Sequence, residues 1–539
     1  MAERTIDSVA RDAFGFESLR AGQREAIEAV LGGRDTLAVM STGSGKSAIY
    51  QIAGMLMEGA TLVISPLIAL QRDQIEAIDD QLPGEAAGVN STVGRSEREE
   101  AFEELEEGEL EFLFLAPEQL ANPEVLENLR EARPSLLVVD EAHCISEWGH
   151  DFRPDYLRLG ALVDELGHPT VLGLTATASP PVREEIVERL HMREPDVIVR
   201  GFDRPNIHLA VQRFQEEEHK RRALVEAIEA AERPGIVYAA TRAIAEELAE
   251  ELDEKGITAC AYHAGMNATQ RDRIQEEFMD DAFEVIVATT AFGMGIDKPN
   301  IRFVFHHAVA DSVDSYYQEI GRAGRDGEHA QAKLFYRTED LGLRRFFAGA
   351  GQVDLDEIAQ VADAVRRHSG PVDPVELKDE LELSQSKLIT AVNRLEEAGA
   401  VHTRPSGEVE LVRDAPPPQQ FVEQAAKLEH DRHEFDRSRV EMMRGYAEHR
   451  NCRRQFILSY FGEDLPEPCG NCDNDEAGIS RASNGDEPFP VGTRVVHRQW
   501  GGGLVQRYED DEVVVLFDSV GYKTLGVPLV LERDLLAPE

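Results

Sequence analysis

The sequence predicts an α/β protein with two successive lobes, each built on a parallel sheet, and several smaller modules behind them. Short apolar runs rich in β-branched residues alternate with helical stretches between residues 37 and 199, and the same alternation returns between 235 and 308. Strands that are buried on both faces and joined by crossover helices show this pattern. A chain of 539 residues is also too long for one core and should divide into about three to five domains.

The strands of each lobe are expected where the apolar runs lie. The first lobe (1–205) and the second (206–347) should meet near Arg200–Asn206. The expected strands are LVISP 62–66, FLFLAP 112–117, LLVVDEAH 136–143 and VLGLTAT 171–177, then GIVYAAT 235–241, TACAYHAG 258–265, EVIVATT 284–290 and FVFHHA 303–308. In such sheets, ligands bind beyond the carboxyl ends of the strands.

Three smaller modules should follow the lobes. Residues 348–415 hold two amphipathic helices and a glycine turn between short strands, which predicts a winged-helix-like module. Residues 416–480 hold charged helices and three cysteines, which predicts a helical hairpin with a metal-binding module. Residues 488–539 alternate turn glycines with β-rich runs, as in a small SH3/Tudor-like β-barrel.

The charge balance argues against a polyanion as partner. Lys and Arg number 56 and Asp and Glu 102, so the formal net charge is −46, whereas affinity for phosphate backbones comes from basic charge. Only 9 of the basic residues are lysines and 47 are arginines. That composition fits either a salt-adapted protein or a GC-rich genome, and the sequence leaves both open.

The five cysteines are too few and too unevenly spaced for a disulfide framework. Metal ligation or free thiols are expected, and Cys144 and Cys260 are taken as ordinary thiols. The first residues carry charges where a signal peptide would be apolar, and no run of 18 apolar residues occurs. We therefore expect a cytoplasmic protein without a membrane partner.

A phosphate-binding loop is predicted at MSTGSGKS, residues 40–47, between the TLAVM strand and a helix. The glycines allow backbone N–H groups to turn toward phosphate oxygens, the lysine reaches the β- and γ-phosphates, and the last serine can ligate Mg²⁺. The usual first glycine of the pattern is replaced by Met40. ATP and Mg²⁺ are therefore the expected ligands, bound by Thr42, Gly43, Ser44, Gly45, Lys46 and Ser47.

The sequence Asp140-Glu141-Ala142-His143 ends an apolar strand, where acidic groups can face a nucleotide. Asp140 is expected to hold Mg²⁺, Glu141 to polarise the attacking water, and His143 to support them. Acids at a strand end often only cap the next helix, but the phosphate loop upstream favours the catalytic interpretation.

In these motifs the chain resembles the RecQ branch of the superfamily-two DNA helicases, over roughly its first 345 residues. Further motifs in the family's order are SPLIALQRDQ 65–74, APEQL 116–120, LTATA 174–178, TTAFGMGIDKPNIR 289–302 and QEIGRAGRDG 318–327. The resemblance implies RecA-like lobes. It also implies that Phe16 stacks on adenine, Gln23 reads its edge and Arg20 assists. Gly295 and Asp297 would link the nucleotide to the strand, and Thr175 and Thr177 would couple DNA to hydrolysis.

The segment CISEWGHDFRPDY, residues 144–156, resembles the aromatic-rich loop of RecQ helicases, which couples single-strand binding to ATP hydrolysis. Trp148 and Phe152 would stack on bases, each worth ~1–3 kcal/mol, and His150 and Arg153 would report to the ATP site. The alternative is an aromatic cluster that packs in the core.

Arg322 and Arg325 lie three apart on a predicted helix and share a face. We expect Arg325 to act as an arginine finger, with Arg322 and Gln318 in support; the alternative is a surface ion pair. Arginines in the binding motifs are also expected to hold the DNA strand, namely Arg153, Arg302, Arg322, Arg325, Arg453 and Arg454.

Cys452, Cys469 and Cys472 have the C-x16-C-x2-C spacing of the RecQ zinc site. The family's fourth cysteine falls at Asp475, and carboxylates also ligate zinc. A Zn²⁺ site of three cysteines and one aspartate is expected, with His449 as fourth ligand or no metal as the alternatives.

The accessory modules depart from the usual family order. If residues 385–398 form a recognition helix, Lys387, Thr390, Asn393 and Arg394 would face DNA, although such modules also bind proteins. Nothing resembles the helicase-and-RNaseD C-terminal domain, and the last segment resembles the barrel of the RqlH-like subgroup. There Trp500 and Tyr508 either line a groove for a protein partner or, more simply, pack in the core.

The resemblance implies an ATP-dependent DNA helicase that moves 3′ to 5′ on single strands, unwinds forked duplexes, and serves DNA repair and recombination. One alternative is a translocase or annealing ATPase that does not unwind duplex. The other is a nucleic-acid-binding scaffold with a dead motor, against which the intact Lys46, Asp140, Glu141 and Arg325 speak.

Overall fold

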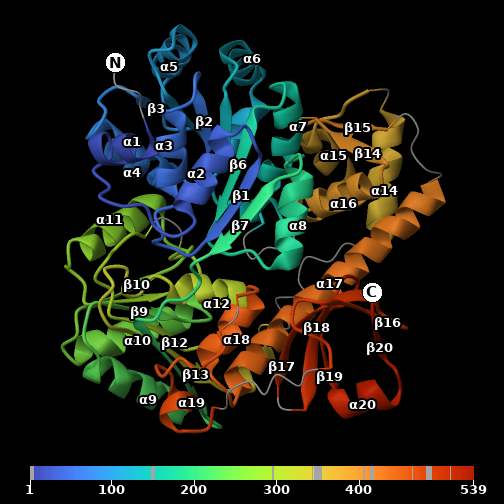
Figure 1. Cartoon of the computed structure of the whole chain (residues 1–539). Coiled ribbons are helices and arrows are strands. Elements are labelled where there is room, and N and C mark those ends of the chain that lie inside the picture. Colours follow the sequence, from blue (N-terminus) through green and yellow to red (C-terminus); the bar gives the residue numbers. More distant parts are fainter. Residues whose placement is uncertain are drawn as a thin grey trace. The chain divides into compact units, whose positions relative to one another are not determined.

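The computed structural model describes residues 5–146, 152–293, 296–342, 344, 355–368, 370–404, 407–412, 418–463, 465–480, 488–509 and 511–539. The chain groups into two compact units. The first comprises residues 1–40, 44–200 and 349–433, and the second comprises residues 41–43, 201–348 and 434–539. Each unit contains one of the two parallel sheets, which confirms the predicted fold class (Figure 1).

The sheet of the first unit has seven parallel strands in the order β3-β4-β2-β5-β6-β1-β7. Two of them, the edge strands β3 and β7, were not predicted as strands, because the AAGV run is short and weakly apolar and the DVIVR run has only three apolar residues between charged ones. The strands are β1 (Thr36–Met40), β2 (Thr61–Ile64), β3 (Ala86–Val89), β4 (Phe112–Leu115), β5 (Leu136–Val139), β6 (Thr170–Thr175) and β7 (Asp196–Arg200).

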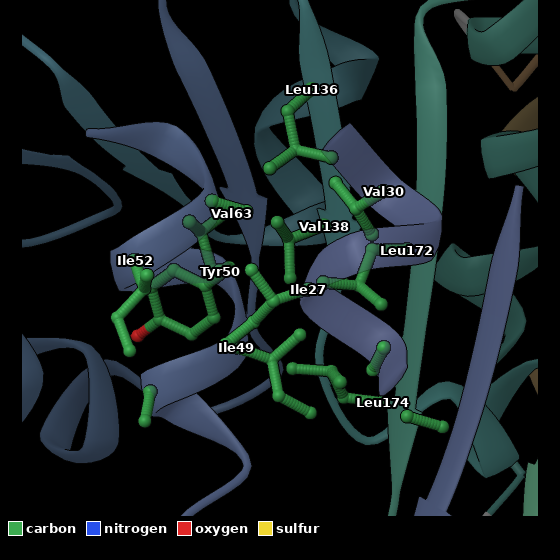
Figure 2. Close-up of a cluster of buried hydrophobic side chains, with 14 of the residues drawn as sticks. Ile27, Val30, Ile49, Tyr50, Ile52, Val63, Leu136, Val138, Leu172 and Leu174 are labelled. Carbon is green, nitrogen blue, oxygen red and sulfur yellow. The ribbon is translucent and has the colours of Figure 1, made fainter. Parts of the chain in front are cut away.

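Helices cover both faces of this sheet. They are α1 (Ile6–Asp12), α2 (Gln23–Leu31), α3 (Ser47–Gly54), α4 (Ile68–Asp79), α5 (Arg95–Glu107), α6 (Pro123–Ala132), α7 (Leu159–Glu165) and α8 (Pro180–Arg189), with the 3₁₀ helices η1 (Pro117–Ala121), η2 (Ala142–Ile145) and η3 (Pro154–Arg158). Figure 2 shows the core under two of them, where Ile27 of α2 and Ile49 of α3 face Val63, Val138 and Leu172 of the sheet. Each of these side chains is at most 1% exposed, and burying one contributes about 1.5–3 kcal/mol. This packing fixes the start of α3, where the phosphate loop ends.

The first unit also holds the winged-helix module, defined here as residues 355–412. Its elements are α14 (Leu355–Arg367), α15 (Pro374–Leu381), α16 (Gln385–Glu397), β14 (Val401–Thr403) and β15 (Val409–Leu411). Ile358, Leu377, Leu388 and Leu395 form its core and are at most 2% exposed. Three helices followed by an antiparallel hairpin match the predicted module. Helix α17 (Pro418–Glu448) follows, with residues up to His433 in the first unit and the rest in the second.

The sheet of the second unit has six parallel strands in the order β10-β11-β9-β12-β13-β8. They are β8 (Ile207–Arg213), β9 (Gly235–Tyr238), β10 (Ala259–Tyr262), β11 (Val285–Ala288), β12 (Phe303–His306) and β13 (Ala330–Tyr336), with helices α9 (Glu217–Ala230), α10 (Arg242–Glu254), α11 (Ala268–Met279) and α12 (Val313–Ile320). Two lysines are buried in this lobe. Lys220 pairs with Asp340 at 2.9 Å, and Lys298 with Asp281 at 2.7 Å.

The rest of the second unit consists of a short helical module and a five-stranded antiparallel sheet in the order β19-β18-β17-β16-β20. The elements are α18 (Arg453–Tyr460), α19 (Asp473–Glu476), β16 (Arg494–His497), β17 (Gly501–Glu509), β18 (Glu512–Phe517), β19 (Gly521–Gly526), α20 (Val527–Glu532) and β20 (Leu536–Pro538). Trp500 stacks on His497 at 4.2 Å, and the Tyr508 hydroxyl bonds to the backbone of Phe489. Both rings pack on the barrel core, as the simpler of the two interpretations expects.

Four buried residues join the lobe, the helical module and the barrel within the second unit; we call them the Asp314 cluster. The Tyr460 hydroxyl of α18 donates to the carboxylate of Asp314 on α12, and Arg439 Nη2 of α17 lies 3.8 Å from the same carboxylate. The ring of Tyr522 from β19 stacks on that of Tyr460, with centroids 5.5 Å apart. Burial and the Asp314 charge raise the pKa of Tyr460 well above its ordinary value, so the hydroxyl remains a donor.

In the described part of the chain, every helix is too short or too polar to cross a membrane.

Candidate nucleotide and nucleic-acid site

The phosphate loop turns between β1 and α3 with Gly43 and Gly45 at φ +76° and +75°, a backbone conformation that glycine adopts without penalty. Lys46 Nζ donates to the carbonyl of Met40 at 3.1 Å. Met40 itself is the last residue of β1 and is 1% exposed. The missing glycine of the pattern therefore falls on a buried strand end, where a side chain is accommodated.

The loop offers polar atoms that suit a bound phosphate chain. Thr42 Oγ1 and Ser44 Oγ are buried and have no hydrogen-bond partner among the described residues. Buried hydroxyls without partners are costly unless a ligand engages them. Ser47 stands at the first position of α3, where its hydroxyl can reach a cation beside the phosphates. The donor set therefore fits a nucleotide.

Gln23 connects the adenine motif to this loop. Its carboxamide Nε2 donates to the carbonyls of Ser44 at 3.0 Å and Gly45 at 2.8 Å, and its Oε1 accepts from the backbone N–H of Arg20 at 2.7 Å. Phe16 is half-buried and stacks on Phe14 at 6.1 Å. The structure thus places Gln23 directly beside the loop expected to hold phosphate.

The two acids follow the end of β5. Burial and the neighbouring Glu141 raise the pKa of Asp140 to about 7, although Lys46 opposes this shift. The hydroxyl of Tyr156 donates to the backbone carbonyl of Asp140 at 2.9 Å and fixes this turn. Glu141 has φ 48°, in the left-handed region that non-glycine residues seldom occupy. A carboxylate beside a lysine and next to the phosphate loop suits a nucleotide-bound cation.

His143 contacts both Glu141 and the neighbouring strand β6. Its Nδ1 lies 2.9 Å from Thr175 Oγ1 and 3.3 Å from Glu141 Oε2. The Thr175 hydroxyl donates to the carbonyl of Thr177 at 3.1 Å, so the imidazole must donate from Nδ1. His143 is 0% exposed and Thr175 is 0% exposed. Thr175 and Glu141 therefore both lie against the same buried imidazole ring.

The aromatic-rich segment is described at both ends. Arg153 donates its backbone N–H to the carbonyl of Cys144 at 2.8 Å and its Nη1 to the carbonyl of Pro66 at 2.9 Å. Phe152 is half-buried. Trp148 and His150, expected to contact DNA, lie outside the described residues. The structure thus ties Arg153 to the SPLIALQRDQ motif of the same lobe.

In the second unit, Arg325 Nη1 pairs with Asp297 Oδ1 at 2.5 Å. Burial and the adjacent Arg322 lower the pKa of Arg325, although Asp297 raises it. Arg322 is 3% exposed and Gln318 is half-buried on α12. Helix α12 ends at Ile320, so Arg322 and Arg325 lie in the turns after it and not, as the sequence had predicted, on one helix face. Gly295 lies outside the described residues.

The late cysteines come together with the aspartate predicted to join them. Ligand atoms of Cys452, Cys469, Cys472 and Asp475 all lie within 4.8 Å of one another. Backbone N–H groups donate to Cys452 Sγ and Cys469 Sγ, each at 3.3 Å, and hydrogen bonds from Cys469 and Cys472 lower the pKa of Cys452 to about 3. Asp475 Oδ1 is buried without a hydrogen-bond partner among the described residues. This donor set fits a tetrahedral Zn²⁺.

Known proteins match most of the chain. The DEAD/DEAH box helicase model matches residues 20–186, the helicase conserved C-terminal domain matches 219–327, and the RecQ zinc-binding model matches 413–476. The probable ATP-dependent DNA helicase RecS of Bacillus subtilis is 36% identical over 459 residues, which cover 85% of this chain and 88% of that protein. The chain belongs to the RecQ family of ATP-dependent DNA helicases.

Other RecQ-family proteins differ from this one in length. The RecQ helicase of Synechocystis is 34% identical over 487 residues, covering 88% of this chain and 99% of that one. This chain spans 62% of the RecQ helicase of Pasteurella multocida, at 36% identity. Among solved structures, the DUF1998 helicase MrfA bound to DNA has a TM-score of 0.53 at 16% identity, covering 77% of this chain and 63% of that one. That likeness concerns the fold. Family membership makes ATP, zinc and DNA the ligands of this RecQ-family helicase.

Three arginines expected on the DNA strand have internal partners instead. Arg302, Arg453 and Arg454 are at most 8% exposed. They pair, in that order, with Asp326, Asp473 and Asp203. The expectation that they hold DNA is wrong, because their guanidinium groups are used to join segments of this RecQ-family fold.

The predicted recognition helix, α16, also differs from expectation. Asn393 and Arg394 are 3% and 2% exposed, and Lys387 pairs with Glu357 at 2.5 Å. From Lys387 to Glu397, every residue of α16 is buried or half-buried, and Thr390 is half-buried. The expectation that Asn393 and Arg394 face DNA is wrong, because packing covers both side chains, whereas Lys387 and Thr390 are half-buried.

Sequence reasoning assigned no role to some residues that shape the site. Tyr156 and Gln74 both bond to Asp140. They lie in the aromatic-rich segment and in the SPLIALQRDQ motif, but neither pattern assigned them a role. Glu185 accepts a hydrogen bond from Ser146 at 2.5 Å. It lies in a charged helical stretch, VREEIVER, whose composition carries no signal of burial.

Proposed function

We propose that this RecQ-family helicase is an ATP- and Mg²⁺-dependent motor that moves 3′ to 5′ along single-stranded DNA and unwinds forked duplexes. The observation that carries the proposal is the series of side-chain contacts that runs from Glu141 through His143 to Thr175, whose hydroxyl bonds to the carbonyl of Thr177. It joins the acid suited to hydrolysis to a motif that RecQ-family proteins use for DNA coupling.

The residues of the site divide the chemistry of ATP hydrolysis among them. Lys46 neutralises phosphate charge, and Asp140 with Ser47 would hold Mg²⁺, which supplies Lewis acidity to the phosphate oxygens when bound. Glu141 orients the attacking water. We propose that Arg325, supported by Arg322 and Gln318, supplies positive charge to the transition state.

On the DNA side, Trp148 and Phe152 would stack on bases of the single strand. Arg153 would report the binding of these bases to the ATP site of the same lobe. Cys452, Cys469, Cys472 and Asp475 would hold Zn²⁺. Membership of the RecQ family supports the proposed polarity and a proposed role in DNA repair and recombination. We also propose the C-terminal barrel as the module open to a protein partner.

The first experiment is an ATPase assay with and without single-stranded DNA. Lys46→Ala should lower the DNA-stimulated rate by at least about 10²-fold, the loss expected when one preorganised charge is removed. Exposed Lys427→Ala on α17 is the matched control. If Lys46→Ala hydrolyses ATP like the parent, the chain is not a motor.

The second experiment distinguishes unwinding from translocation alone. Forked duplexes with a single 3′ or 5′ tail are incubated with ATP and Mg²⁺, and strand separation is followed. Unwinding of the 3′-tailed substrate alone supports the proposal. DNA-stimulated hydrolysis without strand separation on either substrate would favour the translocase or annealing ATPase.

A further inference from the structure

Buried ion pairs hold the winged-helix module on the first lobe. On α8, Glu185 Oε1 lies 3.5 Å from Arg189 Nε and 3.6 Å from Arg432 Nη2 of α17. Arg189 also pairs with Glu397 at the end of α16. Glu397 Oε2 lies 3.2 Å from Arg394 Nη1, whose Nε contacts Glu429 of α17 at 2.9 Å. We call Glu185, Arg189, Arg394, Glu397, Glu429 and Arg432 the ion network.

The ion network is largely shielded from water. Three carboxylates face three guanidinium groups, and the side chains range from 3% exposed for Arg394 to 20% for Glu397. Bulk salt screens such charges far less than surface charges. Removing one partner leaves a buried charge uncompensated, so the network specifies one docking geometry.

The ion network ends at a residue of the aromatic-rich segment. Ser146 Oγ donates to Glu185 Oε2 at 2.5 Å, and Ser146 is 0% exposed. In the sequence, Ser146 comes directly before Glu147 and Trp148. Helix α8 also follows the LTATA motif immediately, and Arg183 Nε donates to the carbonyl of Ala178 at 2.8 Å.

The hairpin of the same module reaches the other flank of this segment. A Cβ atom built on Gly407 would lie 2.4 Å from Nη2 of Arg158, so Gly407, just before β15, lies against η3. Burial lowers the pKa of Arg158, which agrees with a guanidinium covered by protein. The winged-helix module is therefore connected to both sides of the aromatic-rich segment. Ser146 bonds to Glu185 of the ion network, and Arg158 lies against the hairpin residue Gly407.

We propose that Glu185 is a positioning residue for DNA-dependent ATP hydrolysis. It holds Ser146 at the start of the aromatic-rich segment, and the winged-helix module acts through it as a fixed brace instead of reading duplex DNA. This inference rests on the proposed function, because it concerns how single-stranded DNA stimulates the ATPase.

The test compares Glu185→Gln with Glu184→Gln, an exposed glutamate one position earlier on the same helix. Glu185→Gln keeps the size and removes the charge that binds Arg189 and Arg432. The ratio of DNA-stimulated to DNA-independent ATPase should fall, and the half-saturating DNA concentration should rise, by between about 3-fold and 30-fold, the range of measured coupling effects. The KM for ATP should stay within about twofold of the parent's, as for a residue that acts on coupling and not on nucleotide binding.

A second arm guards against misfolding of Glu185→Gln. Glu397→Gln breaks the ion network at its less buried end, and Ser146→Ala removes the hydroxyl at the other end. If both act through one chain of contacts, the double variant should lose less stimulation than the product of the two single losses. Independent, multiplicative losses would overturn the proposal.

The outcomes separate the two levels of inference. A parent protein whose ATPase is not stimulated by single-stranded DNA would overturn the proposed function and this inference with it. A stimulated parent whose Glu185→Gln and Glu397→Gln variants keep its ratio and its half-saturating concentration would overturn the inference alone.

Discussion

The Asp314 cluster permits a quantitative test of how firmly the barrel and helical module are held on the second lobe. Asp314→Asn keeps the size of the side chain and an acceptor for Tyr460, but it removes the charge facing Arg439. Asp314 is 3% exposed and Arg439 is 7% exposed, so solvent replaces little of the lost interaction.

The expected cost follows from this burial. Removing one partner of a buried ion pair destabilises by about 3–5 kcal/mol. Arg439 keeps a second carboxylate, Asp436, at 3.8 Å, so the lower end, about 3 kcal/mol, applies. Tyr460→Phe removes only the hydroxyl and leaves Asp314 paired with Arg439, and it should cost about 1.5–3 kcal/mol, as for a hydrogen bond to a charged group.

Hydrogen exchange is the suitable assay, because unfolding of a chain with two units is not a two-state process. Amides of α18 that exchange by opening of this cluster should exchange about 100-fold faster in Asp314→Asn, since 1.4 kcal/mol corresponds to a factor of ten. Glu441→Gln breaks an exposed pair with Arg444 on α17 and should change exchange less than about threefold. Equal exchange in Asp314→Asn and Glu441→Gln would refute the reasoning.

Three further predictions concern protons, metal and salt. Because the pKa of Asp140 is raised to about 7 and a metal-bound carboxylate must be ionised, binding of Mg²⁺ with ADP at pH 7 should release about half a proton more from the parent than from Asp140→Asn. This excess proton release should vanish near pH 9. Calorimetry in buffers of different ionisation enthalpy measures the release. If the parent and Asp140→Asn release equal numbers of protons at all pH values, the raised pKa of Asp140 is contradicted. Asp475→Ala should lose Zn²⁺ to a chelator about 10- to 100-fold faster than the exposed-site control Glu476→Gln, measured by elemental analysis, and unchanged retention would remove Asp475 from the ligands. Arg302, Arg453 and Arg454 are used internally and should not contact DNA. A logarithmic plot of the half-saturating DNA concentration against salt concentration should therefore have a slope no steeper than about 3. A steeper slope would indicate that such arginines do contact the strand.

The sequence could predict features that depend on local pattern. The phosphate loop, the acids after β5 and the arginine motif after α12 each combine a strand or helix signal with a short motif. The structure brings Gln23, Lys46, Asp140 and the three late cysteines to the places that these motifs predict. The alternation of short apolar runs with helical stretches likewise predicted both lobes.

Features that depend on partners distant in sequence could not be predicted. Strands β8 and β13 pair with each other across 123 residues of the numbering, from Ile207 to Ala330, and neither has the continuous apolar run of a central strand. The arginines were misassigned for the same reason. Whether a guanidinium meets a phosphate or Asp326, Asp473 or Asp203 depends on tertiary contacts that composition does not encode. Helix α16 was amphipathic by pattern, yet α17 and α8 cover its polar side.

The buried lysines of the second lobe have a practical consequence for covalent labelling. The chain has nine lysines, and Lys220 and Lys298 hold their ammonium groups against acids at 1% and 2% exposure. Few reactive amines therefore compete with Lys46, which lies half-buried in the phosphate loop. An amine-reactive nucleotide analogue, followed by peptide mapping, should mark this one position above a low background. The same scarcity means that amine-directed crosslinkers will report on very few distances in this protein, and that carboxylate-directed reagents suit its surface better.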